Sequence, residues 1–311
     1  MNYDSINLSR RDFIHSTTIA GATAAISRQE MPVQTAPLLP TVKFADVDIT
    51  RLIVGSNPFY GYSHFNHVLD QHMREWMTQD RKMEILKSCT EQGINTWQLH
   101  YNDEPYQDFK RYRAEGGKMH LILLADFALM KDPSLVPKVA TEMKPLGIGH
   151  HGNRTDERFR SGEKNKVREF LKIVRDSGVM VGLSTHNPQV IEAVESEGWD
   201  IDYYQACLYR VTRTAEEARK EFGEAPLGEL YYEKDPERMC KVIRQTRKPC
   251  LAFKLLGAGR LINNKGSIEN AFRFALGNIK PTDAVIVGVY PRFSDHLREN
   301  AAIARRILSG T

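Results

Sequence analysis

The amino-acid sequence predicts an α/β protein with a (β/α)8 TIM-barrel fold. Eight short apolar segments alternate with stretches of helical periodicity, which is the pattern of parallel strands joined by helices. Several of these segments end in a residue that can bind or catalyse, as expected for an active site at the carboxyl ends of barrel strands. The first segment is followed by Gly55-Ser56-Asn57-Pro58, which is not a glycine-rich phosphate loop and disfavours a doubly wound sheet.

The composition allows one large core and argues against several classes of protein. The chain has 311 residues, 41% of them hydrophobic, and a net charge of +4 from 43 basic and 39 acidic residues. No basic stripe with interleaved aromatic residues is present, so nucleic acid is not an expected partner. No run approaches about 18 apolar residues, so the mature chain is not expected to insert stably into a membrane. The four cysteines form no C-x-x-C pair, which argues against a zinc knuckle or a redox motif.

The N-terminal segment resembles a twin-arginine (Tat) export signal. The sequence S-R-R-D-F-I at residues 9–14 precedes a weakly apolar run rich in alanine, glycine and threonine. The pattern predicts a signal over residues 1–30, a linker over residues 31–41 and a single barrel domain over residues 42–311. It also predicts the Tat export machinery as a partner and a periplasmic or otherwise extracytoplasmic location.

The strands are predicted in order along the mature chain. Residues 42–44 and 48–50 are expected to form a hairpin over the barrel floor. Eight barrel strands are then predicted at residues 51–55, 94–100, 121–125, 146–149, 179–184, 201–206, 250–256 and 284–288.

The helices are predicted between these strands from their periodicity and their end signals. Thr78 caps the first helix and Gly93 ends it, Pro133 opens the second, and Gly178 ends the third. The predicted helices are residues 78–92, 133–143, 164–176, 188–196, 267–276 and 295–308, with helical stretches between 215 and 245 broken by Pro226 and Pro236. Residues 57–78 are expected to form a long polar and aromatic loop, and loops of this length are usually functional or mobile.

Histidines follow several of the predicted strands. The segment Gly147–Asn153 reads G-I-G-H-H-G-N, and its glycines are expected to let the backbone turn tightly before His150 and His151. His100, His151 and His186 would supply three nitrogen ligands to Zn²⁺ or a similar divalent ion, with an open fourth position for water or a substrate oxygen. Asp126 would be a fourth ligand or a general base. The alternative is that these histidines hydrogen-bond the backbone or bind a polar substrate directly.

Other polar residues are expected at the same end of the barrel. Lys254 interrupts an apolar strand, which suits Schiff-base, base or oxyanion-stabilising roles, and its alternative is pairing with a carboxylate. We therefore predict His150, His151, Asp126 and Lys254 as catalytic. A small-molecule substrate is expected to contact Asn57, Tyr60, Tyr62, His64, Gln98 and Arg260. The aromatic residues among them would alternatively cover the barrel mouth.

Five short motifs in order resemble those of the aldo/keto reductase superfamily over residues 42–309. They are QGINTW at 92–97, VGLST at 181–185, YQ at 204–205, LGAGRL at 256–261, and VG at 287–288 followed by EN at 299–300. The resemblance implies an aldo/keto reductase-like barrel that binds NAD(P)(H), with His150 at the position of the catalytic histidine. The implied cofactor contacts are Ser184, Gln205, Phe253, Gly257, Gly288 and Asn300.

The chain departs from that family at its other catalytic positions. Gln98 occupies the aspartate position, no tyrosine follows it at the expected distance, and Ala125 or Asp126 occupies the lysine position. Without that lysine, a tyrosine is a poor general acid at neutral pH. The resemblance therefore supports the barrel more than the reductase chemistry.

Together these patterns predict an exported TIM-barrel enzyme with a histidine-rich site at the strand ends. It would act as a lyase, isomerase or hydrolase on a polar, carbohydrate-like hydroxyl or carbonyl substrate, with a divalent metal ion as the suspected cofactor. The alternative is an NAD(P)-dependent aldo/keto reductase-type oxidoreductase with a rebuilt proton donor, and the second alternative is a non-catalytic sugar-binding barrel.

Overall fold

The computed structural model describes residues 36–310, which lie in one compact unit. The predicted Tat signal lies outside the described residues. The end of the range predicted as a linker packs against the barrel, because Leu39 is buried and its N–H donates to the Gly93 carbonyl at 3.0 Å. Within the described residues, no helix is long and apolar enough to cross a membrane.

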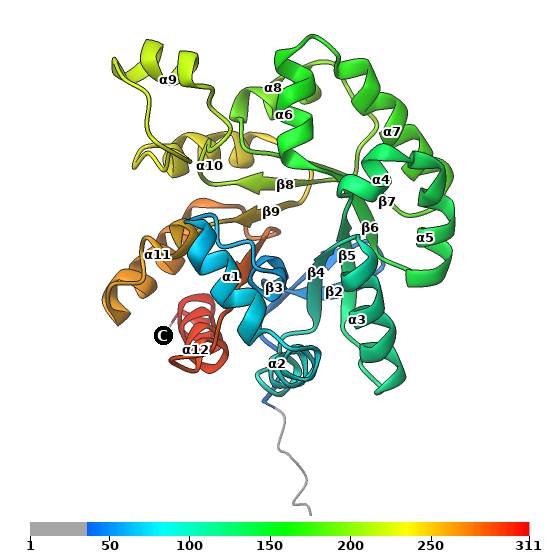
Figure 1. Ribbon diagram of the computed structural model, residues 1–311, viewed down its shortest axis with the longest axis vertical. Coiled ribbons are helices and arrows are strands. Elements are labelled where there is room, and N and C mark those ends of the chain that lie inside the picture. Colours follow the sequence, from blue (N-terminus) through cyan, green and yellow to red (C-terminus); the bar gives the residue numbers. More distant parts are fainter. Residues whose placement is uncertain (1–35, 311) are drawn as a thin grey trace, which may run out of the picture. The chain divides into compact units, whose positions relative to one another are not determined.

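Eight parallel strands close into a barrel, which confirms the predicted (β/α)8 TIM-barrel fold (Figure 1). Each strand pairs with the next along the chain, and β10 pairs with β3 to close the ring. The barrel strands are β3 (Leu52–Gly55), β4 (Thr96–His100), β5 (His120–Leu124), β6 (Gly147–His150), β7 (Met180–Thr185), β8 (Tyr203–Cys207), β9 (Cys250–Phe253) and β10 (Ala284–Gly288).

Helices connect the strands and surround the barrel (Figure 1). The α-helices are α1 (His67–Trp76), α2 (Gln79–Glu91), α3 (Asp103–Ala114), α4 (Phe127–Lys131), α5 (Val136–Met143), α6 (Gly152–Arg160), α7 (Lys164–Asp176), α8 (Pro188–Ser196), α9 (Ala215–Phe222), α10 (Asp235–Gln245), α11 (Lys265–Asn278) and α12 (His296–Ser309). Three short 3₁₀ helices are η1 (Asn57–Tyr60), η2 (Pro133–Leu135) and η3 (Gly257–Gly259).

The expectation of a loop throughout residues 57–78 is wrong, because residues 67–76 form helix α1. The side chain of Asn66 caps this helix by accepting a hydrogen bond from the Leu69 N–H at 2.8 Å. Leu69, Met73 and Trp76 follow at helical spacing and pack against the core. Polar residues lie between these positions, so the apolar face of this helix is difficult to recognise in the sequence.

Three further α-helices that were not anticipated are α3, α4 and α6. Asn102 caps α3, and its side chain accepts from the Asp103 N–H at 3.1 Å. Helix α6 starts directly after His151 without a side-chain cap, so no capping signal marks its beginning. Pro236 does not interrupt α10, because it lies in the first turn of that helix, where a proline N–H is not needed.

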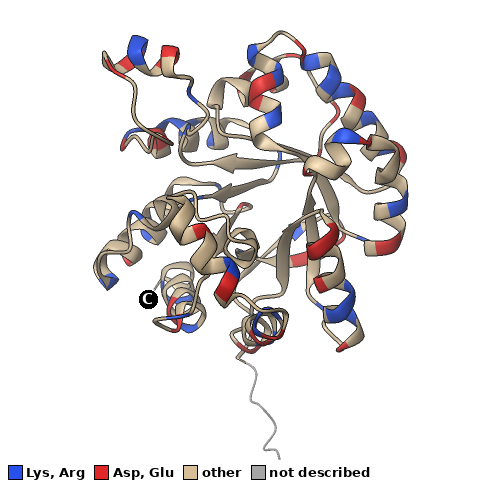
Figure 2. Ribbon diagram, viewed as in Figure 1, with Lys and Arg blue, Asp and Glu red and all other residues tan. Residues whose placement is uncertain are grey.

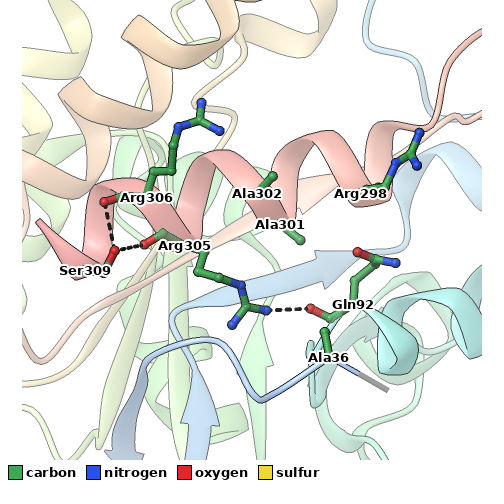
Figure 3. A pocket seen from close by; sticks show the side chains of 8 residues that line it. All are labelled: Ala36, Gln92, Arg298, Ala301, Ala302, Arg305, Arg306 and Ser309. Atoms are coloured by element: carbon green, nitrogen blue, oxygen red, sulfur yellow. Dashed lines mark hydrogen bonds between the residues drawn. The ribbon is translucent and has the colours of Figure 1, made fainter. Parts of the chain in front are cut away.

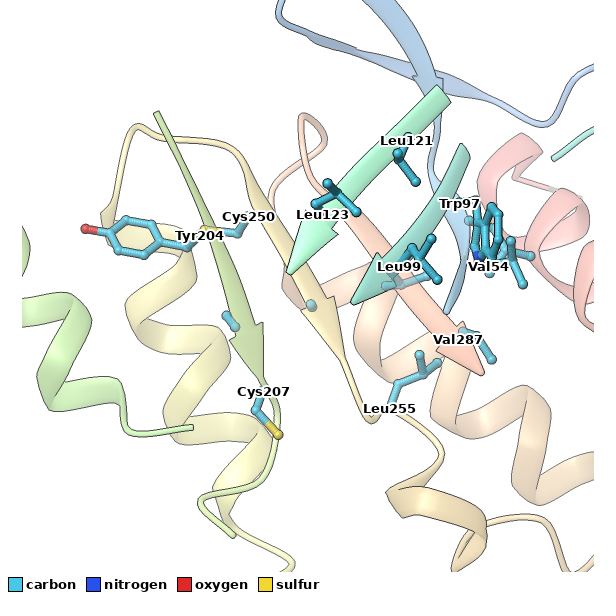
Figure 4. Close-up of a cluster of buried hydrophobic side chains, with 14 of the residues drawn as sticks. Val54, Trp97, Leu99, Leu121, Leu123, Tyr204, Cys207, Cys250, Leu255 and Val287 are labelled. Atoms are coloured by element: carbon cyan, nitrogen blue, oxygen red, sulfur yellow. The ribbon is translucent and has the colours of Figure 1, made fainter. Parts of the chain in front are cut away.

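The main core lies between the strands and the helices that surround them. Trp97 and Leu99 on β4, Leu121 and Leu123 on β5, and Val287 on β10 belong to it (Figure 4). Because successive side chains of a strand point to opposite faces, the intervening residues of each strand face the barrel interior. In the described part of the chain, none of the eight barrel strands carries Lys, Arg, Asp or Glu, and the charged residues lie on helices and connections (Figure 2).

A hairpin closes the amino-terminal end of the barrel, as predicted. Strands β1 (Thr41–Phe44) and β2 (Val47–Thr50) pair antiparallel. Phe44 and Ile49 are buried in a second core inside the barrel, where the Phe44 ring meets Tyr203 at 4.9 Å between centroids. This floor leaves the carboxyl ends of the strands as the open end of the barrel.

Glycines on β6 and β7 make room for Tyr203 inside the barrel. A Cβ atom at Gly182 would lie 2.2 Å from the Tyr203 ring, and one at Gly147 would lie 2.7 Å from it. The turn expected from the glycines of this segment is not their role here, because neither Gly147 nor Gly149 has a positive φ and both lie within β6. These glycines are needed for space.

Candidate active site

Four residues predicted from the sequence interact at the carboxyl ends of four neighbouring strands. His100 ends β4, Asp126 follows β5, His151 follows β6 and His186 follows β7. The charge of Asp126 acts on both His100 and His151, and His151 is also affected by His100 and His186. The barrel therefore brings three imidazoles and one carboxylate into a single electrostatic cluster, which we call the histidine cluster.

The histidines of this cluster are neutral at physiological pH. Burial, together with the charges of His186 and His100, lowers the pKa of His151 to about 4 despite the opposing charge of Asp126. Burial also lowers the pKa values of His100 and His186. Nδ1 of His151 is buried and has no hydrogen-bond partner among the described residues. A neutral imidazole can accept a proton or bind a metal ion, so the cluster is suited to either role.

His186 is held by a buried carboxylate that the sequence did not reveal. Oδ2 of Asp156 lies 3.1 Å from Nδ1 of His186 and accepts a hydrogen bond from the His186 backbone N–H at 3.0 Å. Asp156 also accepts from the hydroxyls of Thr212, at 2.7 Å, and Thr185. Because the carboxylate accepts at Nδ1, it favours the tautomer that leaves the Nε2 lone pair free.

Hydrogen bonding keeps Asp156 ionised although it is buried. Burial acts to raise the pKa of this carboxyl, but the hydrogen bond and charge of His186 and the hydroxyls of Thr185 and Thr212 lower it below its usual value. Asp156 lies on α6, a helix that was not predicted, so its proximity to His186 could not be inferred. Asp156 and His186 form a buried pair that resembles a base and its orienting group.

Gly152 allows the first turn of α6 to approach the interior residues of β7. A Cβ atom at Gly152 would lie 2.9 Å from Cε1 of His186 and 2.9 Å from Oγ of Ser184. Ser184 pairs with Gln205 across β7 and β8, and the Phe253 ring meets His186 edge-on at 5.6 Å. Three of the predicted cofactor contacts thus lie on neighbouring strands around His186, namely Ser184, Gln205 and Phe253.

His150 does not face the barrel interior, which corrects its prediction as catalytic. Its ring packs against Phe170 of α7 at 5.3 Å, and Nδ1 lies 2.7 Å from the hydroxyl of Thr155. Burial, with the neighbouring charge of His151, lowers the pKa of His150 to about 3. The alternation of side chains along β6 directs His150 to the helices and leaves His151 at the barrel mouth.

The two predicted tyrosines differ in their surroundings. Tyr60 is buried, its hydroxyl donates to Asp108 at 3.0 Å, and its ring lies beneath the ammonium group of Lys82. Its hydroxyl is therefore not accessible to a substrate, which corrects its prediction as a substrate contact. Lys82 and Asp108 form a buried ion pair at 2.8 Å that fixes this arrangement. Tyr62 is 43% exposed and its ring meets His100 edge-on at 5.3 Å, which leaves it at the mouth of the barrel.

Lys254 pairs with a carboxylate, which was the alternative left open for it. Its Nζ lies 3.4 Å from Oε2 of Glu229, whose other oxygen lies 2.9 Å from Nδ1 of His64. Nε2 of His64 is 3.1 Å from the side-chain amide of Asn57, and the Arg260 guanidinium donates to the His64 carbonyl at 3.2 Å. Three predicted substrate contacts, Asn57, His64 and Arg260, are thus joined in one network, and Glu229 was missed.

The remaining predicted residues lie on separate elements. Gln98 is buried on β4 and faces the interior below His100. Gly257 begins η3 with a positive φ of 58°, and Asn300 is buried on α12. Gly288 at the end of β10 is exposed, and a Cβ atom there would lie 2.8 Å from Cδ of Pro58 at the start of η1.

Two cavities adjoin the histidine cluster. One, of about 250 Å³, is lined by Asp126, Phe127, Met130, His151, Asn153 and Arg154. The other, of about 350 Å³, includes His186 with Arg210 and Arg213. A third cavity of about 350 Å³ lies against α12, where Arg305 bonds the carbonyl of Gln92, and it contains no predicted site residue (Figure 3). Among the described residues, no three His, Cys, Asp or Glu side chains stand close enough to hold a metal ion.

Comparison with known proteins supports the fold and leaves the activity open. No protein-family model matches the chain, and no curated protein matches it. Its solved structural neighbours include the holo form of aldo-keto reductase AKR11C1 from Bacillus halodurans, at 12% identity and a TM-score of 0.51, covering 88% of this chain and 96% of that one.

Two further structural neighbours have the same fold, with similarly low sequence identities and similar TM-scores. A truncated 3-deoxy-D-arabino-heptulosonate 7-phosphate synthase from Thermotoga maritima has 16% identity and a TM-score of 0.50, covering 88% of this chain and 91% of that chain. A variant of Gox0644 in complex with NADPH has 13% identity and a TM-score of 0.51, covering 85% and 88%. At these identities the similarity establishes that the chain has the TIM-barrel fold that these proteins share.

Proposed function

We propose that this protein is a TIM-barrel enzyme that transfers protons on a polar, carbohydrate-like hydroxyl or carbonyl compound. The observation that carries the proposal is the pair formed by Asp156 and His186, which lies beside His151 and Asp126 at the open end of the barrel. A held, neutral imidazole next to a second imidazole and a carboxylate is suited to abstracting and returning a proton. Lyase, isomerase and hydrolase reactions on hydroxyl or carbonyl compounds all include such a step.

In this proposal His186 is the base. Its Nε2 accepts the proton, and the Asp156 carboxylate stabilises the imidazolium that forms. His151, which is neutral and has an unpartnered Nδ1, binds or protonates a substrate oxygen. Gln205, whose Nε2 is also buried without a partner among the described residues, would donate to a hydroxyl or carbonyl group.

The test is deuterium incorporation from D₂O into a panel of ketoses, aldoses and polyols, followed by NMR. The wild-type protein should exchange a carbon-bound proton or convert at least one compound, and His186→Gln should reduce the rate about 10²–10⁴-fold. His150→Gln is the matched control, because it alters a histidine that faces the helices. Sugar binding without exchange or turnover across the panel would support a non-catalytic sugar-binding barrel instead.

A divalent metal ion is a second candidate for the same cluster. It is favoured by the neutral imidazoles of His100, His151 and His186 around Asp126. As the described side chains stand, no three of them are close enough, so binding would require them to move together. Elemental analysis after dialysis, with activity measured in EDTA, tests this role; no bound metal and unchanged activity would exclude it.

A nicotinamide-dependent reaction is the other candidate. It is favoured by the arrangement of Ser184 and Gln205 on paired strands with Phe253 nearby. It lacks catalytic residues expected of that family, since Gln98 occupies the aspartate position and Ala125 or Asp126 occupies the lysine position. Titration with NADPH, monitored by fluorescence, should give saturable quenching if the cofactor binds, and no quenching would exclude it.

Export by the Tat pathway remains a proposal that rests on the sequence of residues 1–30. Expression of the full chain in a bacterium with a functional Tat system, followed by fractionation, should recover the protein outside the cytoplasm. Replacing Arg10 and Arg11 with lysine should retain it inside. Equal export of both forms would contradict the proposal.

A further inference from the structure

Glu229 places a carboxylate at the barrel mouth, where three donors from separate segments hold it. Its Oε1 lies 2.9 Å from Nδ1 of His64, and its Oε2 accepts from the Tyr231 hydroxyl at 3.0 Å and lies 3.4 Å from Nζ of Lys254. Burial acts to raise the pKa of Glu229, but the hydrogen bond from His64 and the charge of Lys254 lower it to about 2. The carboxylate is therefore ionised and surrounded by donors.

Two of the donors, Tyr231 and His64, also have contacts to residues other than Glu229. Arg260 stacks on the Tyr231 ring, 3.8 Å from its centroid, and also donates to the carbonyl of His64 at 3.2 Å. Asn57 contacts the other nitrogen of the His64 ring. His64 and Lys254 have φ values of 56° and 63°, a conformation that residues other than glycine rarely adopt. Backbone strain of this kind is often found at ligand-binding sites.

The segment that carries Glu229 has no regular secondary structure. It joins α9 to α10, and residues 224–234 contain no helix or strand. Gly228 has a φ of 145°, and the neighbouring Leu227 is fully exposed. Lys254, by contrast, follows β9 directly and its side chain is only 7% exposed. This irregular segment thus supplies both the Glu229 carboxylate and the Tyr231 hydroxyl, whereas Lys254 follows a barrel strand and His64 lies in the connection between β3 and α1.

Removing Glu229 would leave the Lys254 ammonium buried without a counter-charge. Among the described residues, Glu229 is the only carboxylate that forms an ion pair with Lys254. A buried unpaired ammonium is unfavourable, so a ligand that displaces Glu229 has to bring a negative charge. Lys254 directly follows Phe253, whose ring meets His186 edge-on at 5.6 Å, so this anion position lies near the proposed base.

We propose that the donors around Glu229 form a binding site for the carboxylate group of an acidic, carbohydrate-like substrate, and that Glu229 occupies this site in the free protein. The substrate class is thus a sugar acid or a related hydroxy acid. Its carboxylate pairs with Lys254 and accepts from His64 and Tyr231, while its hydroxyl or carbonyl groups extend toward His186. That the bound compound is a substrate rests on the proposed function, whereas the prediction that the site binds a carboxylate does not.

Isothermal titration of the full-length protein with D-glucuronate, D-galacturonate and neutral D-glucose, in a buffer without carboxylates, tests the site. Glu229→Gln removes the competing charge, so this variant should bind at least one of the two uronates about tenfold or more tighter than the wild type. Its affinity for glucose should not change. Glu224→Gln is the matched control, since Glu224 is exposed on the same segment, forms no ion pair with any described residue and should behave as the wild type.

Lys254→Met provides a second test that does not depend on the Glu229 variant folding. It should weaken uronate binding about tenfold or more, and thermal unfolding should verify that the fold is retained. Equal or weaker uronate binding by a folded Glu229→Gln, or no preference for uronates over glucose in any folded variant, would overturn the site. Turnover of neutral sugars with no uronate binding would contradict this inference alone, whereas uronate binding without turnover of any compound would contradict the proposed function alone.

Discussion

Asp156 and His186 are joined by a contact of 3.1 Å between Oδ2 and Nδ1, although 30 positions separate them in the chain. The contact ties the first turns of α6 to the end of β7. Both side chains are buried, and all the donors around the carboxylate come from β7, its following loop and Thr212. The pair is therefore preorganised, because neither group has to change its hydrogen bonds for the free nitrogen of His186 to accept a proton.

Asp156→Asn should abolish most of the activity while the barrel remains folded. An amide can donate to Nδ1, which would favour the tautomer with the proton on Nε2 and remove the base. We expect kcat to fall about 10²–10⁴-fold, with a smaller change in KM. Thr212→Val is the control, because it removes one hydrogen bond to Asp156 and leaves the carboxylate; a similar loss of kcat in both variants would indicate a purely structural role.

His150→Ala and His151→Ala should have opposite effects. Loss of the His150 ring removes its packing against Phe170 and its hydrogen bond to Thr155, so the free energy of unfolding should fall by about 2–4 kcal/mol. His151→Ala should cost little stability and abolish activity. Urea unfolding and turnover, measured on both variants, separate the two roles. A stable but inactive His150→Ala variant would indicate that His150 belongs to the active site after all.

The fold was predictable from the sequence because it depends on patterns that are local. Apolar runs and glycine or proline signals marked all eight barrel strands and the floor hairpin. The orientation of His150 and His151 was harder to predict, because a shift of one residue in strand register exchanges interior and exterior faces. Asp156 and Glu229 were missed because their partners, His186 and Lys254, lie far away in sequence. Neither stands in a recognisable motif.

The stability of the protein should decrease as the pH falls from about 6.5 to 4, partly because of His151. In the unfolded chain this histidine binds a proton below its ordinary pKa of 6.5, whereas in the folded chain its pKa is about 4. Between these values the unfolded state holds more protons, so acid favours unfolding and the contribution is complete only above pH 6.5.

The size of this effect is testable with His151→Gln. Between pH 7 and pH 4 the free energy of unfolding of the wild type should decrease. In the variant this decrease should be smaller by on the order of 2 kcal/mol, as measured by urea unfolding at both pH values. The pKa of buried His150 is about 3, below this pH range, so its titration contributes little to the difference. An identical pH dependence in both proteins would mean that His151 is not shielded from solvent in the folded chain.

Gly182→Ala should destabilise the barrel through Tyr203. The added methyl group would lie 2.2 Å from the Tyr203 ring, which is closed in by Phe44 and the floor hairpin and cannot move away cheaply. Overpacking of this kind costs about 1–3 kcal/mol, and the shortness of the contact favours the upper end. Equilibrium urea unfolding gives the value.

A double-mutant cycle identifies Tyr203 as the cause. Tyr203→Leu removes the ring, so Gly182→Ala should cost at least about 1 kcal/mol less in that background than in the wild type. Gly277→Ala is the control: this glycine lies in α11 with open space around its Cβ position, and alanine there should stabilise the protein by about 0.5–1 kcal/mol. The opposite outcome is that Gly182→Ala lowers the free energy of unfolding equally with and without the tyrosine. That result would show that the Tyr203 ring can shift to make room, and that β7 requires glycine for another reason.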